Sequence, residues 1–250
     1  MQRTYAGAPA TDQQTFERDG VLRWGTVLAP AELDEAVRRL DRAFFATSGV
    51  APGVRDLSER RGRPLQYGLL QKVDLWRVDP FFARLARRGE VVARVERLLG
   101  GAVRLLRDHA FYKPAGKGAA SGLALHQDNR YWHLEPPQAG TLWIALDDAT
   151  VENGCVHYVP GSHRWGRVEH VRPHPDATLL EAVGDEQATP YPVPAGAALF
   201  HHAQVLHGSP PNRTARPRRG YGIVYVRADV LQRGEPITEP LAAGPGGPVQ

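Results

Sequence analysis

The residues best suited to metal chemistry lie in the segment LHQDNRYW at 125–132. His126 and Asp128 are two positions apart, and such side chains point to the same face of an extended segment. One imidazole and one carboxylate can therefore reach the same ion. A third ligand must come from elsewhere, and the segment LFHHAQVLHGSPPN at 199–212 supplies candidates. His207 is the best of these, because it ends an apolar run and is followed by a turn.

Two histidines and one carboxylate occupy one face of an octahedral ion and leave three positions open. Non-haem Fe(II) uses this arrangement to bind an organic co-substrate and O₂ together, whereas zinc usually prefers a closed tetrahedral set or three ligands and one water. Taken alone, a His-x-Asp triplet more often reflects a surface or core histidine beside an aspartate. The second cluster favours the metal hypothesis, because Arg218 follows His207 in the next apolar strand region. That arginine could hold a carboxylate through two parallel hydrogen bonds, although without His207 it would be interpreted as a surface residue in a basic turn.

Helical patterns dominate the first hundred residues. The pair Thr11 and Gln14 fits a capping box at the start of a first helix. Pro30 opens a second helix, and a third helical region runs from Asp79 to the glycines at 100–101. These helices must pack on whatever follows them in the chain.

Short apolar or alternating runs replace the helical period after residue 101. Turn-forming residues separate these runs, which lie at 102–106, 141–146, 155–159, 196–200 and 221–227. The gaps are too short for crossover helices, so the sheet should be mostly antiparallel. The pattern predicts an α+β chain whose core is a double-stranded β-helix, or jelly roll, with the N-terminal helices packed on the sheet.

The composition is that of an ordinary globular protein. Of its 250 residues, 42% are hydrophobic and 23% charged, which excludes disordered, collagen-like and coiled-coil classes. The single cysteine, Cys155, excludes a disulfide framework and a cysteine-based zinc site. We expect one domain over 1–232, with a helical part at 10–100 and the jelly-roll core at 101–230, and then a flexible Pro- and Gly-rich tail at 233–250.

Charge and hydropathy limit the classes of partner that we expect for this protein. The net charge of +4 comes with no nucleic-acid-binding motif. No apolar window is long enough to span a membrane, and the N-terminus does not resemble a secretory signal. We therefore expect a cytoplasmic protein that binds a small-molecule substrate, and neither membranes nor nucleic acid. The oligomeric state is left open.

Three motifs in order carry a family resemblance. They are HQD at 126–128, NGCVHYVPGSH at 153–163 and HGSPPNRTARPRR at 207–219. This order resembles the phytanoyl-CoA dioxygenase family of Fe(II)/2-oxoglutarate oxygenases, and the similarity runs from about Leu70 to Arg227. The resemblance implies that Fe(II), 2-oxoglutarate and O₂ are the cofactor and co-substrates.

The same resemblance implies roles for individual residues. His126, Asp128 and His207 would be the catalytic iron ligands. Arg218 would bind the distal carboxylate of 2-oxoglutarate, with Ser209 donating beside it. Further co-substrate contacts are expected from Gln127, Trp143 and Lys72.

Other residues are assigned by position. Alternation along a strand should turn Arg219 away from the face that carries Arg218. His202 is expected to support the sheet and not to bind iron. Tyr131 and Trp132 indicate an apolar wall for the substrate, although core packing explains two aromatic residues equally well. The irregular segments at 48–70 and 164–192 are further candidates for the substrate pocket.

These observations predict a dioxygenase that hydroxylates an unactivated C–H bond of a small molecule. The arginine-rich composition resembles that of high-GC bacterial proteins and favours a tailoring enzyme of secondary metabolism. One alternative is that the same iron site desaturates, cyclises or epimerises its substrate. An alternative of another class is a catalytically silent jelly-roll module that only binds a small molecule, against which the intact triad and Arg218 argue.

Overall fold

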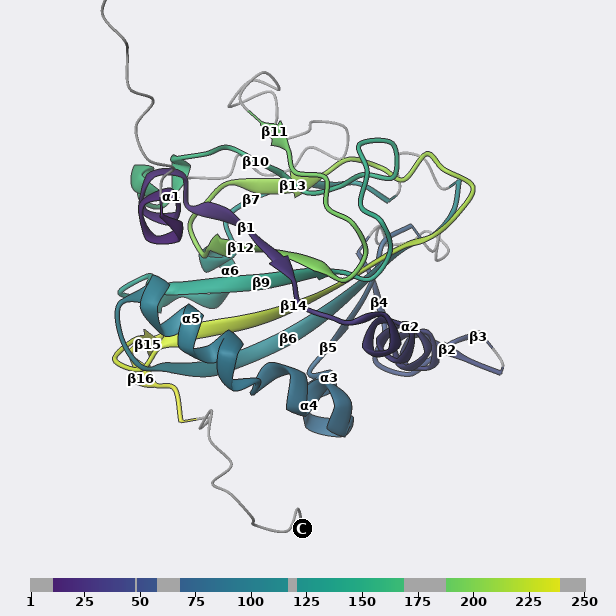
Figure 1. Ribbon diagram of the computed structural model, residues 1–250, viewed down its shortest axis with the longest axis horizontal. Coiled ribbons are helices and arrows are strands. Elements are labelled where there is room, and N and C mark those ends of the chain that lie inside the picture. The colour runs from purple at the N-terminus through teal and green to yellow at the C-terminus, as the bar shows by residue number, and fades with distance from the viewer. Residues whose placement is uncertain (1–10, 48, 58–67, 117–120, 169–187, 239–250) are drawn as a thin grey trace, which may run out of the picture.

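The computed structural model describes residues 11–47, 49–57, 68–116, 121–168 and 188–238. Two antiparallel sheets face each other, and helices α3, α4 and α5 cover the outer side of the larger sheet (Figure 1). The helices are α1 (Asp12–Asp19), α2 (Pro30–Phe44), α3 (Leu75–Val78), α4 (Pro80–Ala86), α5 (Gly89–Leu99), α6 (Asn129–Trp132) and a 3₁₀ turn, η2 (Ser162–Trp165).

The larger sheet has seven strands, in the spatial order β1 (Val21–Thr26), β12 (Ala197–His202), β9 (Ala139–Ala145), β14 (Arg218–Arg227), β6 (Val103–Lys113), β5 (Leu70–Val73) and β4 (Arg55–Asp56). The smaller sheet has four, in the order β11 (Thr189–Pro190), β10 (His157–Tyr158), β13 (His207–Ser209) and β7 (Leu123–His126). Two minor sheets join β16 (Glu235–Pro236), β15 (Leu231–Gln232) and β8 (Leu134–Glu135), and β2 (Phe45–Ala46) and β3 (Gly49–Val50). The predicted α+β jelly roll is thereby confirmed.

Strand alternation divides the larger sheet into two faces. On β9, Leu142 and Ile144 join the apolar core beneath the helices. Trp143 and Ala145 point the other way, into the space between the two sheets. Because successive side chains of a strand point to opposite faces, neighbouring residues of the central strands face alternately the helix-side core and the opposite side of the sheet.

The predicted helix signals are present. The side chain of Thr11 accepts from the backbone N–H of Gln14, and the side chain of Gln14 accepts from the backbone N–H of Thr11. Gly20 ends that helix with φ of 71°, a left-handed conformation that favours glycine. Pro30 is the first residue of the second helix, as its fixed φ allows.

Some boundaries differ from the expectation. The third helical region forms two helices, α4 and α5, because Arg87 and Arg88 leave the helical conformation between them. The short helix α3 precedes this region, and Asp79 separates it from α4 and caps the backbone N–H of Phe81. The helical N-terminal part also supplies strands β1, β4 and β5 to the edges of the larger sheet. The run at 155–159 forms only the two-residue strand β10.

Parts of three expected segments lie outside the described residues. These parts are 48, 58–67 and 169–187 of the two irregular segments and 239–250 of the tail. Within the described residues, no helix has the length and apolar character needed to cross a membrane.

Candidate active site

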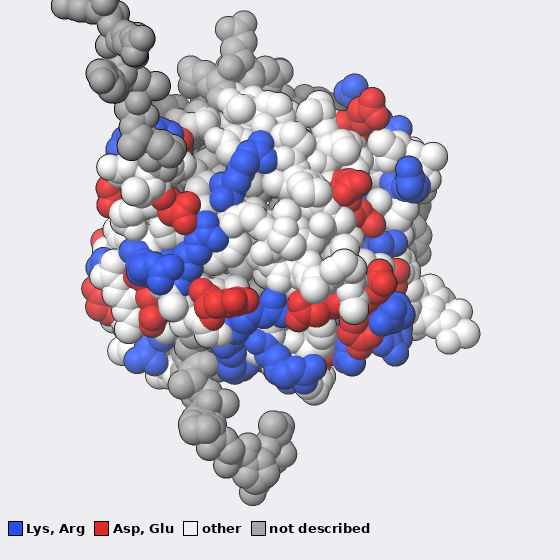
Figure 2. Space-filling model, in the orientation of Figure 1, with Lys and Arg blue, Asp and Glu red and all other residues white. Residues whose placement is uncertain are grey.

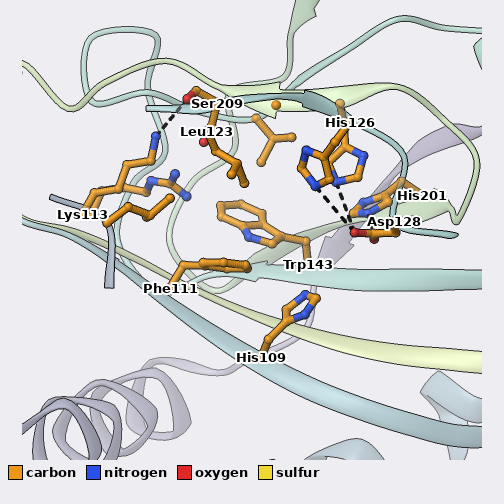
Figure 3. Close-up of a pocket in the computed structure, with 14 residues that line it drawn as sticks. His109, Phe111, Lys113, Leu123, His126, Asp128, Trp143, His201 and Ser209 are labelled. Carbon is orange, nitrogen blue, oxygen red and sulfur yellow. Dashed lines mark hydrogen bonds and ion pairs between the residues drawn. The ribbon is translucent and has the colours of Figure 1, made fainter. Parts of the chain in front are cut away.

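A pocket opens between the two sheets and brings together residues that are far apart in the sequence (Figure 3). Its walls come from β6, β9, β12 and β14 of the larger sheet and from β7 and β13 of the smaller one. The lining residues are Leu69, His109, Phe111, Lys113, Leu123, His126, Asp128, Trp143, Val156, His201, His207, Gly208, Ser209 and Arg218.

One end of the pocket holds His126, Asp128 and His207. One potential ligand atom from each lies within 4.8 Å of the others, and all three residues are buried. Asp128 Oδ1 is 3.6 Å from His126 Nε2 and 3.8 Å from His207 Nε2. The three side chains therefore present three donor atoms around one point.

The local structure explains this convergence. His126 ends β7 and lies directly opposite His207 in the antiparallel pairing of β7 with β13. The chain then leaves the strand, and Asp128 takes a helical conformation as the N-cap of α6. The carboxylate thereby turns back beneath the two imidazoles, whose ring centroids are 4.3 Å apart.

The hydrogen bonds of the two histidines fit a metal ion. His126 Nδ1 lies 2.9 Å from the carbonyl oxygen of Ala124, and His207 Nδ1 lies 3.0 Å from that of Val205. A carbonyl can only accept, so each Nδ1 carries a proton, and in the neutral imidazole Nε2 then has the free lone pair. Metal-bound histidines are commonly oriented by such a hydrogen bond on the other ring nitrogen.

The charge balance also fits a cation. Burial alone would raise the pKa of Asp128, but His207, His126 and His201 outweigh it and hold that pKa well below its usual range. Burial lowers the pKa of His207 well below 6.5. At neutral pH the pocket therefore presents an ionised carboxylate and a neutral His207 imidazole, the protonation states that ligands of a divalent metal need.

Arg218 lies toward the other end of the pocket. It is only 2% exposed, and its Nη2 donates to the carbonyl oxygen of Gly154 at 3.1 Å. Its guanidinium lies over the indole of Trp143, 5.3 Å from the ring centroid. Within the described part of the chain its Nε has no hydrogen-bond partner. Burial lowers the pKa of Arg218 to about 10, so the group is still a cation at neutral pH with a donor left for an anion.

Ser209 and Trp143 line the same pocket, as the resemblance implied. Arg219 instead turns away, and its guanidinium lies 3.0 Å from Asp147 and 3.0 Å from Asp41. Alternation along β14 thus separates two adjacent arginines as predicted.

Lys72 does not reach the pocket. It lies opposite Ala110 in the pairing of β5 with β6, and its ammonium donates to the carbonyl oxygen of Pro52. The lysine in the pocket is Lys113, which the sequence reasoning did not select. Lys113 lies opposite Arg218 in the pairing of β6 with β14, and its Nζ is 3.2 Å from the carbonyl oxygen of Ser209.

Gln127 also differs from the expectation, because it does not line the pocket. Its amide nitrogen donates at 2.8 Å to the carbonyl oxygens of Gly166 and Gln204, and its amide oxygen accepts from the backbone N–H of Val168. As the residue between His126 and Asp128, it points away from them and ties two loops together.

The two aromatic residues after HQD have different positions. Trp132 is buried in an apolar cluster with Leu134 and Val224, so core packing explains it. Tyr131 is 62% exposed, and its ring centroid is 6.0 Å from that of His126. Only Tyr131 is therefore available to contact a substrate near the metal end.

Two further histidines were not selected from the sequence. His201 and His109 both line the pocket, on β12 and β6. Burial lowers the pKa of His109 to about 4, so that imidazole is neutral at physiological pH. His202, in contrast, lies on the opposite face of β12 from His201, against Phe16 and His163, in accord with a supporting role.

Glycines make room on the pocket floor. Gly220 and Gly222 of β14 lie opposite Phe111 and His109 of β6. A Cβ on Gly220 would lie 2.5 Å from the indole of Trp143, and one on Gly222 would lie 2.4 Å from His109 Nε2. The missing side chains thus allow an aromatic ring and an imidazole to lie against the sheet.

Comparisons with known proteins agree with this geometry. Residues 16–220 match the family model described as phytanoyl-CoA dioxygenase (PhyH). The chain is 35% identical over 173 residues to L-proline trans-4-hydroxylase of Streptomyces griseoviridis, an alignment covering 60% of this chain and 64% of that protein. It is 26% identical to the ectoine dioxygenase of Nocardia farcinica, over 92% of this chain and 80% of that one.

Solved structures share the fold. The α-ketoglutarate-dependent carbocyclase SnoK from nogalamycin biosynthesis superposes with a TM-score of 0.76 at 23% identity, covering 94% of this chain and 98% of that one. EvdO2 of Micromonospora carbonacea, in complex with 2-oxoglutarate, has a TM-score of 0.67 at 28% identity, covering 95% and 98%. The chain belongs to the phytanoyl-CoA dioxygenase family, among the non-haem oxygenases that depend on iron, 2-oxoglutarate and O₂.

Proposed function

We propose that His126, Asp128 and His207 bind Fe(II), that Arg218 anchors 2-oxoglutarate, and that the enzyme hydroxylates an unactivated C–H bond of a small molecule. The observation that carries the proposal is the arrangement of one buried pocket. The three potential metal ligands lie at one end. Toward the other end lies the guanidinium of Arg218, whose Nε has no hydrogen-bond partner among the described residues. A dicarboxylate co-substrate can engage both.

The roles of the chain's own residues follow from this arrangement. Arg218 binds the distal carboxylate, and Trp143 beneath the guanidinium restricts its orientation. Ser209 and Lys113 place further polar groups at the same end. Bound at the triad, ferrous iron with 2-oxoglutarate and O₂ supplies the oxidising equivalent that breaks a C–H bond, while 2-oxoglutarate becomes succinate and CO₂.

The protein must also exclude water and orient the target carbon. The sheets bury the triad on the inner side, and Tyr131 stands at its exposed side, next to His126. We therefore place the substrate beside Tyr131. Biosynthetic tailoring of a small molecule is the role we favour, because the epimerase SnoN from nogalamycin biosynthesis is 25% identical to this chain, with a TM-score of 0.68.

That similarity also supports epimerisation as a second candidate reaction. Hydroxylation and epimerisation begin with the same hydrogen removal, and they differ in whether the carbon then receives oxygen or a hydrogen atom. The mass of the product separates them, because hydroxylation adds one oxygen and epimerisation leaves the mass unchanged.

The test is anaerobic reconstitution with Fe(II) and 2-oxoglutarate, followed by admission of O₂ over fractionated small-molecule extracts. We expect succinate release that depends on a particular fraction and exceeds that of the His207→Ala variant. Stoichiometric binding of a small molecule with succinate at the level of this variant would contradict the proposal and identify a silent binding module.

A further inference from the structure

The second carboxylate oxygen of Asp128 is held by a buried polar chain. Asp128 Oδ1 faces His126 and His207, whereas Oδ2 lies 3.2 Å from Thr141 Oγ1 and 3.3 Å from His201 Nε2. The two oxygens therefore have different partners: one faces the proposed ion, and the other faces the protein.

His201 is itself held from behind. Its Nδ1 lies 2.9 Å from the hydroxyl of Tyr158, and both side chains are buried. The ring of Tyr158 stacks on that of His207, with centroids 5.8 Å apart. A continuous path thus runs from Tyr158 through His201 to Asp128.

The register of the strand pairs brings these hydrogen-bonded side chains together. His201 of β12 lies directly opposite Thr141 of β9, so both side chains approach Asp128 from the larger sheet. Tyr158 of β10 lies opposite His207 of β13, so it approaches from the smaller sheet. Figure 3 shows the ring of His201 beside the carboxylate of Asp128, at the same end of the pocket as His126.

Hydrogen-bond chemistry determines where the protons lie. An ionised carboxylate can only accept, so both Thr141 and His201 Nε2 must donate to Oδ2. In a neutral imidazole the other nitrogen is then an acceptor, and the Tyr158 hydroxyl donates to His201 Nδ1. In this series of hydrogen bonds, Tyr158 donates to His201 and His201 donates to Asp128. His201 therefore carries its proton on Nε2, whereas His126 and His207 carry theirs on Nδ1.

We infer that His201, oriented by Tyr158 and assisted by Thr141, is a positioning residue that restricts Asp128 to binding the metal through Oδ1 alone. The inference rests on the proposed function of the triad. A carboxylate that bound through both oxygens would take a further coordination position, one of those that the co-substrate and O₂ need. The hydrogen bonds from Thr141 and His201 disfavour binding through both oxygens, because Oδ2 would have to give up both of them in a buried site.

The variants that test this are His201→Phe and Tyr158→Phe, with His202→Phe as the matched control. His201→Phe keeps a ring in the same space but removes the donor to Oδ2. Tyr158→Phe keeps the stacked ring and removes only the hydroxyl. His202 is the adjacent buried histidine of the same strand, and it contacts Phe16 and His163 and not Asp128.

The readout is Co(II) titration of the metal-free protein, followed by visible absorption. It reports affinity and, through band intensity and position, coordination. We expect His201→Phe to weaken Co(II) binding by about 10- to 100-fold, the usual effect of removing a hydrogen-bond partner of a metal ligand. We expect the spectrum to change as Asp128 becomes free to bind through both oxygens. Tyr158→Phe should shift the spectrum in the same direction with a smaller loss of affinity, and His202→Phe should match the wild type.

Three other outcomes would contradict either the positioning role of His201 or the proposed metal ligands. If His201→Phe and His202→Phe give the same spectrum and affinity, the positioning role is wrong. If His201→Phe abolishes binding as completely as His126→Ala, His201 is a ligand and not a positioning residue. If His126→Ala binds Co(II) as the wild type does, the triad itself is misassigned, and the failure belongs to the proposed function.

Discussion

Arg218 lies directly opposite Lys113 across the antiparallel pair of β14 and β6, and both side chains are buried in the pocket. Burial and the neighbouring guanidinium lower the pKa of Lys113 to about 5, whereas burial lowers that of Arg218 only to about 10. At neutral pH this end of the pocket therefore contains one fixed cation and one neutral amine that donates to backbone carbonyls.

Lys113 should make the stability of the metal-free protein depend on pH. The unfolded chain has a lysine pKa near its ordinary value of about 10.4, so between pH 5 and 10 it binds more protons than the folded chain. The free energy of unfolding therefore rises with pH across this window, by at most about 1.4 kcal/mol per pH unit for one group. Urea unfolding between pH 6 and 9 should show a shallower rise for Lys113→Met. Lys72→Met is the control, because Lys72 lies outside the pocket, and equal slopes in the two variants would contradict the assignment.

Arg218→Lys should weaken 2-oxoglutarate binding much more than Arg219→Lys. Lysine keeps the charge but loses the planar fork that binds a carboxylate through two hydrogen bonds. We expect at least a tenfold loss, about 1.4 kcal/mol, in titrations of the metal-loaded protein. Arg219 pairs with Asp41 and Asp147 away from the pocket, so its variant should bind almost normally. Equal losses would mean that the anchor is not confined to one face of β14.

His207→Ala should abolish iron binding and turnover, whereas His202→Ala should retain most of both. Of these two histidines, His207 is the one that presents Nε2 to the proposed ion, with its Nδ1 held by the carbonyl of Val205. Metal content after reconstitution and desalting, together with succinate formation, measures the difference. A His202→Ala protein without iron and a His207→Ala protein with iron would show that the wrong histidine was chosen.

Gly220→Ala should disturb the co-substrate end of the pocket. The new Cβ would lie 2.5 Å from the Trp143 indole, which lies beneath the guanidinium of Arg218. We expect the ring to shift, the protein to lose about 1–3 kcal/mol of stability from overpacking, and 2-oxoglutarate affinity to fall. Thermal unfolding and co-substrate titration check this. Gly89→Ala is the control, since its added Cβ would meet no atom within 4 Å apart from its chain neighbours and the nearby backbone of its own helix. An equally large effect there would remove the packing explanation.

Local patterns in the sequence were enough to predict the class of fold. The change from helical to strand period after residue 101, and the short gaps between runs, indicated antiparallel sheets with helices packed on them. Spacing also selected the right neighbours at the metal end, because His126 and Asp128 are near in the chain and His207 stands in a separate motif. The structure brings these three side chains together, and their role as ligands is a proposal that the variants above test.

Tertiary structure alone decided which face of each strand looks into the pocket. Alternation shows that His201 and His202 point to opposite sides, but only the packing of β12 between the helices and the smaller sheet puts His201 inside. The same limit explains why Lys72 was chosen and Lys113 was not. A lysine's place in a motif does not reveal its partner across the sheet, and that register arises from contacts between segments far apart in the sequence. Residue types and their local period thus determined the chemistry available to this protein, while the pairing and stacking of distant strands determined which side chains share the pocket.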